Sequence, residues 1–278
     1  MTALRHIQPV SIAGLKPQPV EEMGPAPVVE WVDPTDLSIE TAYQRDLSER
    51  SLRMIRRIIL SEWSWDRFKP PVCSRLEDGV LVVVDGQHTA IAAASHPGID
   101  RIPVFIVASS AAAGRADAFV GHNRDRLAIT RTQMHRAAVA AGDDTAVALD
   151  EACRAAGVTL LSISRQRGEW KAGETIAVTA LLRVVTAKGR AGAARVLRIL
   201  VEAGQRPIST LLIRAVFDLL YQPEWRVTDD AELSRAIRGN TAEAWERWAA
   251  DNKVQGQTAS RTVAVELFRR LPSSRETG

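Results

Sequence analysis

Apolar positions in the first half of the chain change period repeatedly, as they do where strands and helices alternate. A β-type run at 28–32 is followed by an amphipathic stretch from Ser48 to Leu60, with Ser48 placed to cap a helix. Segments 70–75 and 80–84, joined by a Glu-Asp-Gly turn, predict a hairpin. Residues 87–95 predict a helix and 102–107 a further strand. This order predicts a compact α+β unit.

Helical periodicity dominates the second half. Helices are expected over 132–141, 144–156, 175–188, 191–203, 209–220, 230–238, 241–252 and 260–271. Segment 158–175 lacks a helical period and predicts either a strand-like excursion or an exposed basic loop. Trp245 and Trp248 follow a helical spacing that indicates core or an oligomer contact rather than a base-stacking platform.

The chain therefore divides into three predicted parts. Residues 1–27 contain five prolines, few bulky residues and no period, which is typical of a flexible leader. An α+β domain is expected over 28–129 and a mostly α-helical region over 130–278.

Composition narrows the class of protein. The 278 residues are 46% hydrophobic and 25% charged, as in folded soluble proteins. Since there is no apolar run of about 18 residues and no signal-peptide pattern, we expect a cytoplasmic protein without membrane contact. Cys73 and Cys153 lie far apart without ligand-like neighbours, so neither a disulfide framework nor a zinc site is predicted. Both are expected to be buried small residues.

Basic residues suggest polyanion binding without specifying it. The pI is about 9.1, and only five of the 36 basic residues are lysine. Arginine forks suit phosphate, although codon bias produces the same skew. The segment 122–136 is strongly basic and fits either a nucleic-acid backbone or a solvated helix face. The candidate DNA contacts are Arg131, Arg136, Arg165 and Arg167.

The most specific pattern is the hydrophobic strand 82–84 that breaks at Asp85-Gly86 and enters a helix of small residues. Such a junction presents free N–H groups to an anion, and Gly86 allows close backbone approach. Gln87, His88 and Thr89 add side-chain donors in the first turn. An ordinary strand-turn-helix has the same pattern.

Several motifs, taken together, resemble the ParB/sulfiredoxin superfamily over about residues 30 to 135. They are Tyr43-Gln44-Arg45, Pro70-Pro71-Val72, Asp85-Gly86-Gln87-His88-Thr89 and Gly121-His122-Asn123-Arg124-Asp125-Arg126. The last is similar to the family's ENxxR box, with Asn123 and Arg126 in the corresponding places. The resemblance implies a ParB/sulfiredoxin-like domain that holds a nucleotide triphosphate, followed by the helical region.

The ligand that the resemblance implies is a nucleotide, CTP or ATP, with Mg²⁺. The candidate nucleotide-binding residues are Gln44, Arg45, Asp85, Gly86, Gln87, His88, Thr89, Asn123, Arg124 and Arg126. It also implies a bacterial or phage DNA-associated protein that forms a homodimer. A helix-turn-helix tested at 149–166 fits poorly, because Gln166 falls where a core apolar residue is needed.

The departures from the family affect catalysis more than binding. Thr89 stands where the family's turn has Arg, and His122 stands where its box has Glu. Since Mg²⁺ prefers carboxylate oxygens, hydrolysis is disfavoured. The turn contains no Cys, which excludes sulfiredoxin activity.

Two other functions stay open on the sequence alone. One is a phosphotransferase of the same fold, in which Glu40, Asp46 or Asp85 would act as base. The other is a non-catalytic interaction module with a vestigial anion site. The sequence does not identify catalytic residues for an enzyme, and no protein metal site is expected.

Overall fold

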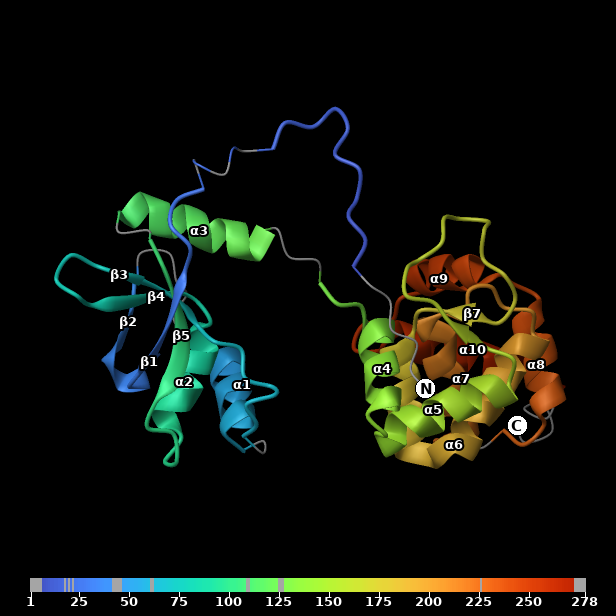
Figure 1. The fold of residues 1–278 in the computed structure, drawn as a ribbon. Helices are drawn as coiled ribbons and strands as arrows, with labels where there is room; N and C mark the ends of the chain where they lie inside the picture. Colours follow the sequence, from blue (N-terminus) through green and yellow to red (C-terminus); the bar gives the residue numbers. More distant parts are fainter. Residues whose placement is uncertain are drawn as a thin grey trace. The chain divides into compact units, whose positions relative to one another are not determined.

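The computed structural model describes residues 7–17, 19, 21, 23–41, 47–60, 63–108, 111–124, 128–225 and 227–272. The chain forms two compact units, Met1–Leu127 and Ala128–Gly278, each with its own hydrophobic core (Figure 1). The first unit is α+β and the second is mostly helical.

A five-stranded mixed sheet organises the first unit. Its strands are β1 (Val28–Val32), β2 (Leu37–Ile39), β3 (Val72–Arg75), β4 (Leu81–Asp85) and β5 (Ile102–Val107), in the spatial order β1-β5-β3-β4-β2. β1 with β5 and β3 with β4 pair antiparallel, whereas β3 with β5 and β2 with β4 pair parallel. The expected hairpin is therefore confirmed. The short strand β2 was not predicted.

Helices cover both faces of this sheet. They are α1 (Glu49–Leu60), α2 (Gln87–Ser95) and α3 (Ala112–Arg124), with a 3-10 turn η2 (Pro34–Asp36) before β2. The Ser48 hydroxyl accepts the Ser51 N–H at 3.2 Å, which confirms the predicted cap of α1. Figure 1 shows α1 and α2 side by side, and these two helices pack against each other.

The alternation along the strands explains the two layers. Val83 and Cys73 point to the α2 side, where they form a buried cluster with Ala90 and Ala93. Val82 belongs to the opposite face of the same strand and is buried too, and α3 packs against β4. Because both faces of β4 are covered, its sequence is apolar at every position from Leu81 to Val84.

The second unit contains α4 (Arg131–Ala140), α5 (Asp144–Ala155), α6 (Val178–Glu202), α7 (Thr210–Tyr221), α8 (Asp230–Arg238), α9 (Ala242–Asp251) and α10 (Ala259–Arg270). Two short strands, β6 (Thr159–Leu160) and β7 (Glu174–Thr175), pair in parallel and join the ends of an exposed loop. Segment 158–175 thus contains both a short pair of strands and an exposed loop, so each of the two expectations for it is met in part. Since α5 ends at Ala155 and β6 follows, residues 149–166 form no helix-turn-helix.

The two helices expected at 175–188 and 191–203 run as one ribbon, α6, with a break in helical geometry at Gly189 (φ 65°). The helix begins three residues later than predicted. Thr175 lies in β7 instead, where its hydroxyl donates to the Ile208 carbonyl at 2.7 Å and accepts the Ala177 N–H at 3.0 Å. A contact distant in sequence therefore overrides the local helical pattern.

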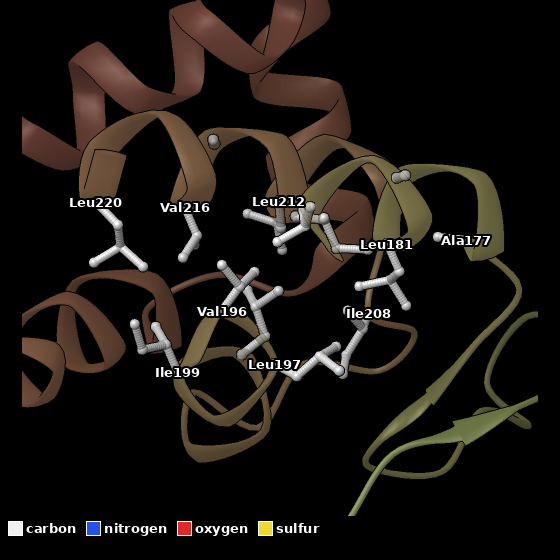
Figure 2. Packing of buried hydrophobic residues seen from close by; sticks show 14 of the residues in the cluster. Ala177, Leu181, Val196, Leu197, Ile199, Ile208, Leu212, Val216 and Leu220 are labelled. Carbon is white, nitrogen blue, oxygen red and sulfur yellow. The ribbon is translucent and has the colours of Figure 1, made fainter. Parts of the chain in front are cut away.

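The helical core is built from α6 and α7 facing each other. Figure 2 shows Leu212, Val216 and Leu220 from α7 opposite Val196 and Ile199 of α6. Trp245 is also completely buried, and its indole N–H donates to the Ile237 carbonyl at 3.1 Å. Of the two roles expected for Trp245, core residue and oligomer contact, the structure shows the core residue.

Both cysteines are buried, as predicted. Burial raises the pKa of each thiol, Cys73 and Cys153, to about 12. Neither is therefore a ready nucleophile. No helix in the described part of the chain has the length and apolar character needed to cross a bilayer.

Candidate functional site

The turn between β4 and α2 has a backbone conformation that favours glycine. Gly86 has φ 93° and ψ 21°, in the left-handed region. A Cβ at this position would lie 3.0 Å from the Cα of Pro71, which is itself buried. The backbone conformation and the close contact with Pro71 both favour glycine at the start of α2.

The first turn of α2 offers backbone donors that have no hydrogen-bond partner among the described residues. The helix ladder begins with the Ala90 N–H, which donates to the Gly86 carbonyl at 3.0 Å, and Gly86 supplies no side-chain cap. The N–H groups of Gln87, His88 and Thr89 precede this first bond and have no place in the ladder. Together with the helix dipole, they make the turn suited to an anion.

Asp85, the last residue of β4, contacts both the turn and Lys69. Asp85 accepts the Gly86 N–H at 2.9 Å and also lies 3.2 Å from the Lys69 ammonium, whose side chain is 57% exposed. The carboxylate is thus compensated by a local cation, and the lysine remains accessible from solvent. This cation was not among the residues predicted from the sequence, because Lys69 is 16 residues away from Asp85.

A pocket of about 130 Å³ adjoins the turn. Its apolar lining comes from Ile58 of α1 and from Trp63 and Phe68 in the loop before β3. Of the predicted residues that the structure describes, only Thr89 lies in its wall.

Polar groups line the rest of this pocket. Ser64 and Thr89 contribute hydroxyls, and Arg67 and Lys69 contribute cations. The pocket thus combines an apolar wall with a cationic rim.

Aromatic packing fixes the loop that forms the pocket. The Trp63 ring lies 5.6 Å from that of Phe68, 5.9 Å from Trp65 and 5.5 Å from His96. Trp65 also contacts Trp31 of β1, edge to face at 5.6 Å. Such contacts between rings stabilise the loop, which has no regular secondary structure.

A nearly buried ion pair ties α3 to the end of β2. Arg115, only 6% exposed, donates to both oxygens of Glu40 at 2.9 and 3.1 Å. Glu40 was considered as a catalytic base, but in this structure its carboxylate is held by a guanidinium. Sequence reasoning missed Arg115, because 75 residues separate the partners and α3 has no clear amphipathic period.

The remaining predicted nucleotide contacts are only partly described. Asn123 and Arg124 lie in the last turn of α3. Gln44, Arg45 and Arg126 fall outside the described residues, as does Asp46, one of the carboxylates considered as a base.

The predicted DNA contacts occupy two kinds of environment. Arg131 and Arg136 are exposed on α4. Arg165 instead forms a double hydrogen bond at 2.7 Å with Glu174, and this bond holds the pKa of that buried carboxyl below its usual value. Arg167 pairs with Glu243 at 3.1 Å in an exposed position.

The described residues do not fit a protein-bound magnesium ion. Asp85 already has Lys69 and the Gly86 N–H as partners. Elsewhere in the described ranges, no group of three or more His, Cys, Asp and Glu side chains could hold a metal. What the turn offers an anion is therefore backbone N–H groups and the neighbouring lysine.

No family model matches the chain, and no curated protein matches it. A solved structure, the C-terminally truncated chromosome-partitioning protein ParB from Caulobacter crescentus complexed with CTP-γ-S, is similar at a TM-score of 0.33 and 12% identity. The match covers 86% of this chain and 98% of that one. A likeness at these values carries no argument about function.

Proposed function

We propose that the first unit binds a nucleotide through its phosphates at the turn from Asp85 to Thr89, and that the helical unit binds DNA. The observation that carries the nucleotide half is Gly86: its left-handed backbone, packed against Pro71, begins α2 directly after Asp85, whose carboxylate pairs with Lys69. The sequence resemblance to the ParB/sulfiredoxin superfamily supports the same ligand class.

Phosphate transfer is not proposed. Of the carboxylates considered as its base, Glu40 is paired with Arg115 and Asp85 with Lys69. Each of these two carboxylates is therefore already engaged by a cation of the protein itself.

Calorimetric titration of the full chain with CTP, ATP, ADP and GTP, with and without Mg²⁺, tests the nucleotide half. Arg126→Ala removes a predicted phosphate contact and should weaken binding by about tenfold or more, since a charge-assisted hydrogen bond contributes about 1.5–3 kcal/mol. Arg53→Ala, at an exposed position of α1, is the matched control and should bind normally. Failure of every nucleotide to bind would refute the proposal.

The DNA half is tested by the salt dependence of duplex binding. Arg131 and Arg136 are exposed on α4, whereas Arg165 is already engaged by Glu174. Replacing both Arg131 and Arg136 with Ala should reduce the slope of log K against log salt by about two, which is roughly one released counterion per phosphate contact. Arg165→Ala should change the slope less. An unchanged slope in the double variant would exclude α4 from the interface.

A further inference from the structure

The pocket and the proposed phosphate site share Thr89 and adjoin at Lys69. Lys69 lines the pocket and also contacts Asp85, the residue before Gly86. Thr89 lines it from the first turn of α2. A ligand whose anionic group rests on the N–H groups of that turn therefore reaches the pocket with its remaining part.

The pocket wall suits a flat, largely apolar ring. Trp63 and Phe68 form the aromatic side, and Ile58 forms part of the aliphatic side. Aromatic side chains of this kind can stack on a flat ring.

The rim of the pocket suits a ring that has polar edge groups and is joined to an anionic group. Arg67 is exposed, and its backbone is fixed by a turn in which its N–H donates to the Ser64 carbonyl at 3.0 Å. Lys69 lies on the side of the phosphate turn, and the hydroxyls of Ser64 and Thr89 can exchange hydrogen bonds with ring substituents. An apolar ligand would make no ion pair with Arg67 or Lys69, and a bare phosphate would make no contact with the aromatic wall.

We propose that this pocket holds the base of the nucleotide whose phosphates lie at the Gly86 turn, so that the loop 63–69 selects nucleotides over other phosphate compounds. This inference rests on the proposed function. It assigns recognition to a loop that the motif resemblance did not include. Stacking on Trp63 and Phe68 supplies the affinity, and Arg67 contacts the base or sugar edge.

The test compares nucleotides with inorganic tripolyphosphate, which has phosphates but no base. The full chain should bind its preferred nucleotide at least about fivefold more tightly than tripolyphosphate, because stacking of a base on aromatic side chains gives a gain of this order or larger. Phe68→Leu should remove most of that difference and leave tripolyphosphate affinity unchanged. Phe105→Leu, at an exposed position of β5, is the matched control and should alter neither affinity.

A second measurement avoids dependence on one core variant. Photo-cross-linking with 8-azido-ATP and 5-iodo-CTP should label the peptide containing residues 63–69, as identified by mass spectrometry, and unlabelled nucleotide should compete.

Equal affinity for nucleotide and tripolyphosphate, or labelling only of other peptides, would overturn the pocket assignment while the phosphate site stands. If neither ligand binds, the proposed function and this inference both fail.

Discussion

Gly86 lies where three requirements coincide: a left-handed backbone, contact with Pro71 and the start of α2. Its neighbour in the hairpin, Gly79, shares the first requirement with φ 89° but faces open space. A comparison of alanine variants at the two positions therefore separates the cost of the left-handed backbone from the cost of the clash with Pro71.

Gly86→Ala is expected to destabilise the first unit by about 2–3 kcal/mol, because backbone strain and overpacking add. Gly79→Ala should cost about 1 kcal/mol from the left-handed backbone alone. Thermal unfolding of the two variants measures the difference. Equal losses would show that the Pro71 contact contributes nothing.

His135 on α4 is 4% exposed, and neither ring nitrogen has a hydrogen-bond partner in the described part of the chain. Burial lowers its pKa from the usual value of 6.5, opposed by Asp150 and Asp143 and reinforced by Arg136. The folded protein thus favours the neutral imidazole.

Acidification should therefore loosen α4. Between the lowered folded pKa of His135 and 6.5, the unfolded chain binds more protons, so the fold loses stability as the pH falls through that window. Hydrogen exchange of α4 in the full chain should be faster at about pH 5.5 than at about pH 7.5, after correction for intrinsic rates. His135→Leu should reduce this difference, and His122→Leu, at an exposed position, should preserve it. An undiminished difference in His135→Leu would assign the effect to other groups.

At the scale of elements, most of the hydrophobic periods in the sequence correspond to helices or strands in the structure. β1, α2 and β5 have the predicted bounds, because each is a run whose period its own residues define. β2 and α3 were missed for a different reason. β2 has three residues and is stabilised by parallel pairing with β4, and α3 is rich in small residues that define no apolar stripe.

The docking of α3 should depend on its ion pair with Glu40. Arg115→Ala leaves a carboxylate that is only 24% exposed without its main cation, so we expect a loss of about 2–4 kcal/mol in denaturant unfolding. Arg75→Ala is the matched control, since its pair with Glu30 is more than 40% exposed on both sides and should contribute at most about 1 kcal/mol. Similar small losses in both would mean that α3 docks through apolar packing alone.

At the scale of the whole molecule, each unit has its own core. The helical unit buries a continuous cluster from α5 to α10, and the sheet unit buries a smaller cluster between its strands and α2. Independent cores imply that the units can fold separately.

A fragment of residues 128–278 should therefore show a helical circular dichroism spectrum and a cooperative thermal transition. The fragment 1–127 should fold with a mixed spectrum and retain nucleotide binding if the proposed site is complete within it. A fragment 128–278 that unfolds without a cooperative transition would show that its core requires the first unit.

The sequence by itself determined local features: hydrophobic period, the Ser48 cap, the hairpin turn and the Asp85-Gly86 break. These depend on interactions within a few residues, which apolar spacing and backbone preferences report directly. Only the tertiary structure placed Lys69 beside Asp85, paired Arg115 with Glu40 and drew Thr175 into β7. It also closed the Trp63–Phe68 wall against α2. These partners are distant from one another in the sequence, so no local pattern predicts their contacts. The pocket is therefore formed by the packing of distant segments rather than by any one motif.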